Sequence, residues 1–316
     1  MNKARVLTNH TIAERFSRCL RAYAKQKWIF LMLLPAIIYY AIFKYAPMYG
    51  ATLAFKDFNI RKGIWDSPWA GLKYFEQLFR MGSFFEVLRN TVVISFYKLL
   101  VGFPAPIIFA ILLNELRYTR MKKVVQTISY LPHFLSWVVL GSIFLQFFSP
   151  SSGPFNYLLR MLNLPDIYVL TSPEWFRTFL VATSVWKSVG WGSIMYLASL
   201  GNIDTELYDA AKVDGAGRFR RIWHVTLPGL MPVITIMLIL QVGQLINDDF
   251  DQIYNLYNAA VYRVADVIST YIYRVGLLEV NYSLATAVGL FKNVIALVLV
   301  VSANAITKRV NDYGLW

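Results

Sequence analysis

The sequence predicts an all-α membrane protein that crosses the bilayer six times, and three observations carry this prediction. Of the 316 residues, 57% are hydrophobic and only 16% are charged, whereas a soluble domain is usually about half apolar. Six runs of the chain have the length of roughly 20 mostly apolar residues that a helix needs to span a bilayer. The basic residues concentrate in alternate segments between these runs.

The six expected spans divide the chain into a long helical domain and two short ends. In chain order they cover residues 28–53, 87–113, 128–148, 179–200, 229–246 and 284–306. The first is not a cleavable signal peptide, because its apolar part exceeds the roughly 7–15 residues of a signal's core and no small-x-small cleavage site follows. We therefore expect an N-terminal arm (1–27), a six-helix domain (28–306) and a C-terminal tail (307–316). The arm either lies on anionic lipid as an orientation signal or packs on a larger complex.

The net charge of +13 reflects membrane topology rather than nucleic-acid binding. Lys and Arg cluster in four segments that six crossings would place on one side of the membrane: 1–27, 117–123, 212–221 and 308–309. Basic residues favour the cytoplasmic side, so both termini are expected there. The single cysteine, Cys19, excludes an intrachain disulfide and a Cys-rich metal site.

Motifs for catalysis and nucleotide binding are absent from the sequence. It contains no G-x-x-x-x-G-K-[ST], and therefore no P-loop for ATP, and no H-E-x-x-H, G-x-S-x-G or Cys/His cluster. We expect no catalytic residue, no metal ligand and no cofactor in this chain. The expected external segments are 54–86, 149–178 and 250–282. Aromatic residues crowd the first of them and form either an interfacial belt or a docking surface for an extracytoplasmic protein.

The most informative segment is 207–221, a charged, helix-forming stretch between two apolar runs. Asp204 or Thr205 is a suitable N-cap before it. Gly215 allows the chain to turn, and Pro228 is suited to the start of the next span. We expect a cytoplasmic loop over 201–228 that offers a helix to another protein.

The residue spacing of this loop resembles the cytoplasmic coupling loop of permease subunits in binding-protein-dependent ABC importers. Asp209 stands for the family's commoner glutamate and Val225 for its isoleucine. The resemblance implies a type I ABC importer permease architecture, with a helix over 209–220 seated in a groove of a separate ATP-hydrolysing subunit. It assigns ATPase coupling to Asp209, Ala210, Ala211, Asp214, Gly215, Arg218, Leu227 and Pro228.

Further segments resemble the subgroup of these permeases that imports complex oligosaccharides, often polysaccharide fragments. They are residues 44–50, 55–59, 67–72, 250–254 and 313–316. The resemblance implies a bacterial cytoplasmic membrane protein that works with a second homologous permease, two ATPase subunits carrying ATP and Mg²⁺, and an extracytoplasmic solute-binding protein.

Similarity to the related maltose permease implies a substrate path through the third, fourth and fifth spans. The matching positions are Ser129, His133, Ser184, Lys187, Ser188, Trp191, Gln241 and Asp248. The residue types differ from those of the maltose permease at every position, so maltose is not expected, and the sugar site could instead lie on the partner permease.

The charges near this path leave two interpretations open. Lys187, His133 and Lys292 would favour an anionic sugar such as a uronate oligomer. Alternatively, Lys187 and Lys292 pair with Asp248 or Asp249 in structural ion pairs. Trp191 could stack on a sugar ring or serve in packing.

Other functions compete with the import of acidic oligosaccharides. The same machinery could import neutral oligosaccharides or another solute, such as a phosphate, a metal chelate or a peptide. A remote alternative is an intramembrane enzyme or an assembly factor, which would act alone and tolerate substitution of Gly215. Import predicts that changes at Asp209 or Gly215 abolish transport while the protein stays in the membrane.

Overall fold

The computed structural model describes residues 26–245 and 249–311. Most of the expected N-terminal arm, Cys19, Asp248 and residues 312–316 lie outside the described residues. The described chain consists of helices and connecting segments, with two isolated bridges in place of a sheet. It divides into two compact units, Met1–Thr52 and Leu53–Trp316.

The first unit holds the first expected span. It comprises α2 (Lys27–Tyr40), the π-helical η1 (Ala41–Tyr45) and most of the 3₁₀-helical η2 (Ala46–Phe55). Together they form an apolar helix of 28 residues, Trp28–Phe55. No residue in the most apolar stretch of this helix is buried. Its length and apolar composition suit a membrane span.

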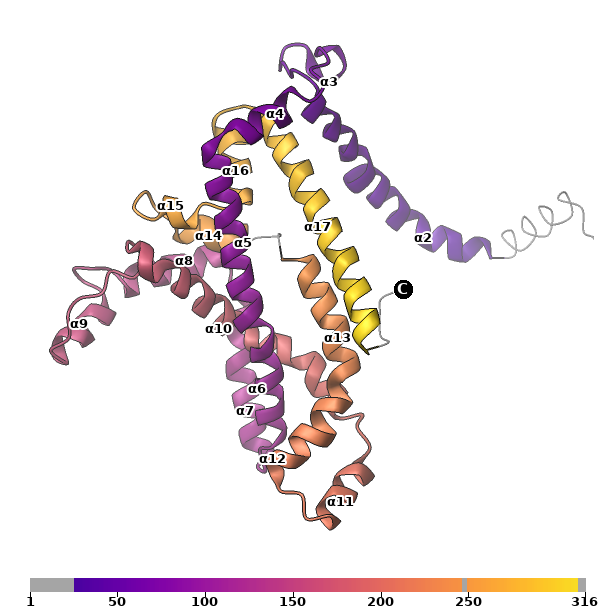
Figure 1. The fold of residues 1–316 in the computed structure, drawn as a ribbon, viewed down its shortest axis with the longest axis vertical. Helices are drawn as coiled ribbons and strands as arrows, with labels where there is room; N and C mark the ends of the chain where they lie inside the picture. Colours follow the sequence, from indigo (N-terminus) through magenta and orange to yellow (C-terminus); the bar gives the residue numbers. More distant parts are fainter. Residues whose placement is uncertain (1–25, 246–248, 312–316) are drawn as a thin grey trace, which may run out of the picture. The chain divides into compact units, whose positions relative to one another are not determined.

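The second unit contains the remaining helices (Figure 1). In chain order they are α3 (Gly63–Asp66), α4 (Lys73–Arg80), α5 (Gly82–Gly102), α6 (Pro104–Asn114), α7 (Thr119–Tyr130), η3 (Leu131–Phe134), α8 (Trp137–Phe147), α9 (Pro154–Met161), α10 (Pro173–Leu200), α11 (Thr205–Val213), α12 (Arg218–Arg221), η4 (Ile222–Thr226), α13 (Leu227–Gly243), α14 (Phe250–Leu256), α15 (Tyr262–Ala265), α16 (Ile268–Tyr273), η5 (Arg274–Leu278) and α17 (Tyr282–Asn311).

Within the described chain, four helices are long and apolar enough to cross a membrane: Trp28–Phe55, Gly82–Asn114, Arg218–Gly243 and Tyr282–Ala305. A bent pair of helices, 119–134 and 137–147, makes a fifth if it counts as one span. The 28-residue α10 is not among them, since Lys187 and several Ser, Thr, Gly and Trp residues lower its mean hydropathy. The all-α, membrane-embedded fold is confirmed, and the count of six crossings stays a prediction.

The third expected span differs from the straight helix that the sequence suggested. Its two halves meet at an angle of 99°. Pro132 lies at the first turn of η3 and cannot donate a backbone hydrogen bond. The side chain of Ser136 then caps α8 by accepting a hydrogen bond from the amide of Val139 at 3.3 Å. Proline and a new N-cap four residues later therefore produce a break.

The long α10 packs against α5, α6 and α7, and α13 packs along α17 (Figure 1). Two glycines allow α10 to approach its neighbours closely. A Cβ at Gly190 would lie 2.2 Å from the carbonyl oxygen of Ser129 on α7, and one at Gly192 would lie 3.1 Å from Pro106 on α6. Small residues at helix contacts are typical of membrane bundles.

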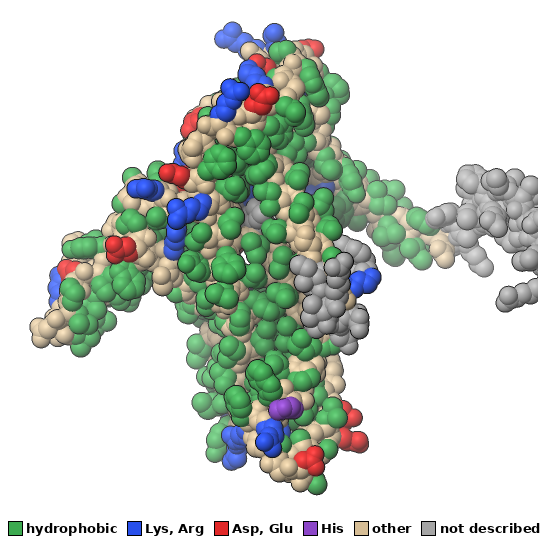
Figure 2. Space-filling model, in the orientation of Figure 1, with side chains coloured by type: hydrophobic (Ala, Val, Ile, Leu, Met, Phe, Trp, Pro, Cys, Tyr) green, Lys and Arg blue, Asp and Glu red, His purple; other side chains and the backbone are tan. Residues whose placement is uncertain are grey.

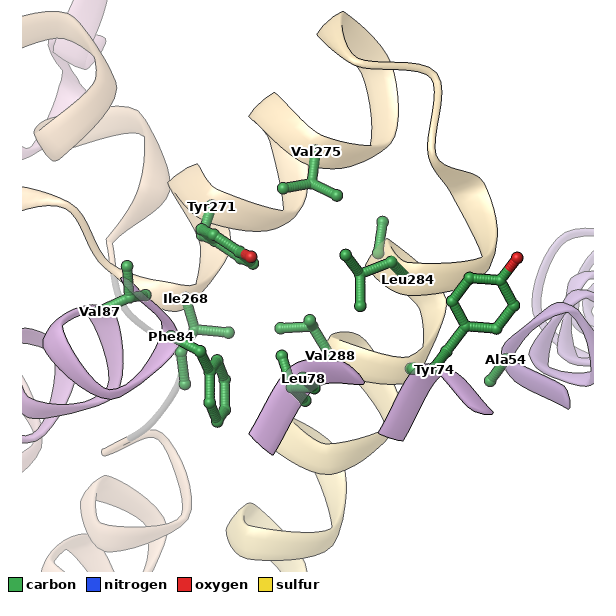
Figure 3. Packing of buried hydrophobic residues seen from close by; sticks show 12 residues of the cluster. Ala54, Tyr74, Leu78, Phe84, Val87, Ile268, Tyr271, Val275, Leu284 and Val288 are labelled. Atoms are coloured by element: carbon green, nitrogen blue, oxygen red, sulfur yellow. The ribbon is translucent and has the colours of Figure 1, made fainter. Parts of the chain in front are cut away.

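Buried apolar side chains form separate clusters at the two ends of the second unit. Figure 3 shows the cluster at the end that carries α4 and α16, where Phe84, Leu78, Ile268 and Val288 meet. A smaller cluster around Leu230 joins α6, α10 and α13 closer to the end that carries α11. In Figure 2, charged side chains gather at these two ends. The surface between the ends is covered largely by hydrophobic side chains.

A polar contact fastens the loop before α4. Lys73 donates to a carboxylate oxygen of Asp57 at 2.8 Å, and the hydroxyl of Tyr74 also donates to this carboxylate. The two hydrogen bonds, that of Lys73 first, lower the pKa of Asp57 below its ordinary value. Ser283, at the start of α17, donates to the carbonyl of Lys56 at 2.7 Å, so this loop is also tied to the last helix.

Candidate coupling loop and transmembrane cavity

The segment 201–228 contains the helix that the sequence predicts. The side chain of Asp204 accepts a hydrogen bond from the amide of Glu206 at 2.9 Å and so caps the start of α11. Glu206 adds a negative charge in the first turn, where the helix dipole favours it. Local sequence therefore determines where α11 begins.

The end of α11 has the hydrogen bonds of a Schellman motif. Gly215 has φ = +75°, a left-handed conformation that favours glycine. The amide of Gly215 donates to the carbonyl of Lys212 at 3.0 Å, and the amide of Ala216 donates to that of Ala211 at 2.8 Å. The chain then turns into α12, whose N-cap is Gly217. Pro228 lies in the first turn of α13 as expected, but the π-helical η4 joins α12 to α13 without a break.

The outward surface of this loop carries apolar side chains between charged ones. Val213 is 89% exposed and Phe219 is 80% exposed, on either side of the turn at Gly215. Asp209 forms an exposed ion pair with Lys212 at 2.7 Å on the same helix. The sequence analysis did not single out Val213 and Phe219. The available signal was an apolar residue before and another after the glycines of a charged segment.

The base of the loop is fixed to the bundle at two points. The hydroxyls of Tyr208 on α11 and Thr226 in η4 are 3.0 Å apart and share a hydrogen bond, with Thr226 buried. At Gly229, a Cβ would lie 2.7 Å from the side chain of Ile203, so the turn before α11 packs directly on α13. The loop is thereby tied to α13 by a polar contact and an apolar one.

Three of the expected substrate-path residues lie together at the bend between α7 and α8. The imidazole of His133 stacks on the indole of Trp191, with 4.6 Å between ring centroids and an interplanar angle of 1°. Lys187 donates to the carbonyl of His133 at 2.9 Å and lies 5.5 Å from the ring centroid of Trp137. One face of Trp191 is therefore used in packing, and Lys187 holds the end of η3.

Two of the remaining path residues, Ser129 on α7 and Ser188 on α10, satisfy their hydroxyls locally. Ser188 donates to the carbonyl of Ser184 at 2.7 Å, and Ser129 donates to that of Gln126 at 3.0 Å. Lys292 on α17 donates to the hydroxyl of Ser269 at 2.6 Å.

The expected ion pair between Lys187 and Asp249 does not form. Asp249 pairs instead with Lys98 of α5 at 2.6 Å. Lys98 lies at the start of α14, because it also donates a hydrogen bond to Gln252 of that helix. The Lys187 amine instead donates to the carbonyl of His133 at the bend between α7 and α8. The other proposed partner, Asp248, lies outside the described residues.

Gln241 lies at a cavity of about 260 Å³ between α5, α13 and the segment that leads into α14. The polar side chains that line this cavity belong to Ser95, Lys98, Gln241, Gln244 and Asp249. Polar and ionisable residues inside membrane spans are functional candidates, since burying them in an apolar environment is costly. No group of His, Cys, Asp and Glu suited to a metal ion occurs among the residues that the structure describes.

Comparisons with known proteins agree with this architecture. Residues 102–312 match the family described as binding-protein-dependent transport system inner membrane component. Protein LplB of Bacillus subtilis is 44% identical over 93% of this chain and 93% of its own length. The polygalacturonan/rhamnogalacturonan transport system permease protein YteP of the same organism is 41% identical over 96% of this chain and 94% of its own length.

Solved structures show the same fold. A subunit of a bacterial ABC transporter involved in the import of the acidic polysaccharide alginate is 41% identical, with a TM-score of 0.87 over 93% of this chain and 99% of that chain. A bacterial alginate ABC transporter in complex with alginate pentasaccharide-bound periplasmic protein contains a chain that is 40% identical, with a TM-score of 0.88 over 94% of this chain and 100% of that one. The chain therefore belongs to the family of inner membrane components of binding-protein-dependent transport systems and is a permease subunit of a sugar ABC importer, not an enzyme.

Proposed function

We propose that this permease imports oligosaccharides derived from acidic polysaccharides by alternating access. The observation that carries the proposal is the similarity over nearly the whole chain to a permease named for polygalacturonan and rhamnogalacturonan and to a subunit of an alginate importer. The polar cavity at Gln241 offers amide, hydroxyl and charged groups that can form hydrogen bonds with sugar hydroxyls.

Four further subunits would complete the importer. A second, homologous permease is needed because one subunit of this size is too narrow to surround an oligosaccharide. Two ATPase subunits would hold ATP and Mg²⁺, since this chain has no P-loop. An extracytoplasmic solute-binding protein would deliver the sugar. The basic segments place both termini in the cytoplasm of a bacterial cell, with 1–27 and 307–316 as cytoplasmic ends of the 28–306 domain.

Coupling to ATP hydrolysis would run through α11. In the proposed complex, Val213 and Phe219 insert into the groove of an ATPase subunit, and the small Ala210 allows close approach. When two ATPase subunits close on ATP, the displacement of α11 reaches α13 through the hydrogen bond between Tyr208 and Thr226. The loop 201–228 then serves as the coupling loop, with the eight residues named from the sequence in or beside its contact surface.

Neutral oligosaccharides are the second candidate substrates, and one observation favours them. Each of the three lysines near the proposed path has an acceptor inside the protein: Asp249 for Lys98, the His133 carbonyl for Lys187, and Ser269 for Lys292. A cation that already has a partner attracts an anionic sugar less strongly than an uncompensated one.

The test is the ATPase activity of the reconstituted complex with loaded binding protein. Oligogalacturonates and neutral oligosaccharides of the same length would be compared, with Lys187→Met as a variant. We expect both the presence of binding protein and an acidic oligosaccharide to be required for stimulation. If neutral oligosaccharides stimulate ATP hydrolysis and acidic ones do not, the substrates are neutral oligosaccharides. If no saccharide stimulates ATP hydrolysis, the proposal is contradicted.

A further inference from the structure

We propose that the ion pair between Lys98 and Asp249 sets the charge selectivity of the transmembrane cavity, with Asp249 acting as an exchangeable partner that a sugar carboxylate replaces on Lys98. This inference rests on the proposed function and names the group that would distinguish acidic from neutral saccharides. It moves the anion-recognising role from Lys187 to a different lysine.

Lys98 lies near the middle of the apolar helix Gly82–Asn114, where a charge is costly. Its side chain is only 14% exposed, and its amine is 2.6 Å from the carboxylate of Asp249 and 2.5 Å from the amide oxygen of Gln252. The amine therefore has two acceptors of different character, one charged and one neutral.

The neutral acceptor is part of a rigid structure. Gln252 is fully buried, and its amide nitrogen donates to the carbonyl of Leu180 at 2.8 Å and to the hydroxyl of Thr183 at 2.9 Å on α10. Because this amide is fixed by α10, Gln252 holds the Lys98 amine at the cavity whether or not Asp249 is present.

The charged acceptor is the exposed member of the pair. The side chain of Asp249 is 49% exposed, against 14% for Lys98, and it lies just before the first turn of α14. It can therefore turn toward water at a smaller cost than Lys98 can. Both side chains line the same cavity as Gln241, so a sugar in the cavity meets the ion pair directly.

A uronate and a neutral sugar would use this pair differently. A neutral sugar binds beside the intact pair, through hydroxyls that pair with Ser95, Gln241 or Gln244. A uronate carboxylate can take the place of Asp249 on Lys98, and Asp249 then becomes hydrated. No covalent bond changes. Lys98 keeps one carboxylate partner throughout, and the extra negative charge that the uronate brings is offset by the hydration of the displaced Asp249 carboxylate.

The exchange predicts opposite effects for two single substitutions. Asp249→Asn keeps an oxygen acceptor but removes the competing charge, so the preference for uronate over neutral oligosaccharide should rise by about tenfold, which corresponds to about 1.4 kcal/mol. Lys98→Gln leaves Asp249 uncompensated in the cavity, so the preference should fall by a similar factor. The double variant should be insensitive to the charge of the sugar.

The experiment measures KM and the maximal rate of saccharide-stimulated ATP hydrolysis in the reconstituted complex with each variant, using trigalacturonate and a neutral trisaccharide. Asp166→Asn is a matched control. It also removes one carboxylate charge from an ion pair, because Asp166, in the segment after α9, pairs with Arg160 of α9. Membrane level and complex assembly of each variant would be measured alongside.

The proposal requires the ratio of uronate to neutral KM to move in opposite directions in the two single variants and to stay constant in Asp166→Asn. If both variants lose activity on both sugars equally, the pair only stabilises the fold and the proposal is overturned. If neither sugar stimulates even the wild-type complex, the proposed function itself fails, which is a different result from an unchanged ratio.

Discussion

At the scale of single residues, Gly215 is the position where backbone conformation has the clearest consequence. Its φ of +75° lies in the left-handed region, and a Cβ there would meet no atom within 4 Å. Space is therefore available for a side chain, and only the backbone conformation resists one. Gly217, two residues later, also has open space but an ordinary φ of −65°.

This difference gives a matched pair of substitutions. Gly215→Val should destabilise the turn by about 1–2 kcal/mol, because a left-handed conformation is unfavourable for a residue with a branched side chain. We expect at least a tenfold loss of sugar transport at a normal membrane level. Gly217→Val should retain most of the transport activity, and equal loss in both variants would contradict the role of the turn.

Asp57 gives a prediction on pH. Its pKa is lowered, first by the hydrogen bond from Lys73 and then by that from Tyr74. A depressed pKa means that the contact stabilises the loop above the unfolded pKa of about 3.9 and that this contribution is lost as the pH falls through the lower folded value. Hydrogen exchange in residues 56–75, corrected for intrinsic rates, should therefore not change between pH 8 and 5. Asp57→Asn should exchange faster over this whole range, and a wild-type transition near pH 6 would contradict the assignment.

At the scale of elements, the contact between α11 and the start of α13 decides whether movement of the coupling loop reaches the membrane. Tyr208 and Thr226 supply its polar part, and Ile203 against Gly229 supplies its apolar part. Ile203 lies just before the first residue of α11 and Tyr208 lies within α11, so the two contacts hold the start of this helix together.

Removing the hydroxyl of Tyr208 tests this transmission. Tyr208→Phe should cost about 1 kcal/mol of local stability and lower the number of sugars transported per ATP hydrolysed, while basal ATP hydrolysis continues. Thr226→Val should have the same effect, and the double variant should be no worse than either single one, because both remove one hydrogen bond. Additive losses in a double-mutant cycle would contradict the link.

The elements that were predicted correctly are those determined by nearby residues. The N-cap at Asp204 and the turn at Gly215 both follow from local sequence. The 99° bend at η3 was missed, although Pro132 and Ser136 mark it, because apolar residues continue on both sides. The pairing of Lys98 with Asp249 could not be predicted, since it joins residues 151 positions apart and depends on how α14 packs against α5 and α10.

At the scale of the whole molecule, this chain is a membrane subunit of a transporter, and we propose that other subunits supply the energy for transport. Its described part combines apolar helices, a polar cavity and the exposed helix-containing loop 201–228. In the importer that we propose, substrate movement depends on ATPase subunits that contact this loop and on a binding protein that delivers the sugar.

The most direct test is uptake of a labelled oligogalacturonate into proteoliposomes that contain the complete complex. Binding protein and sugar would be supplied outside, with ATP or a non-hydrolysable analogue enclosed at the face of the ATPase subunits. We predict accumulation above the external concentration only with hydrolysable ATP and binding protein together, and loss of accumulation in Gly215→Val. Accumulation without ATP, or in complexes that lack the ATPase subunits, would contradict the account.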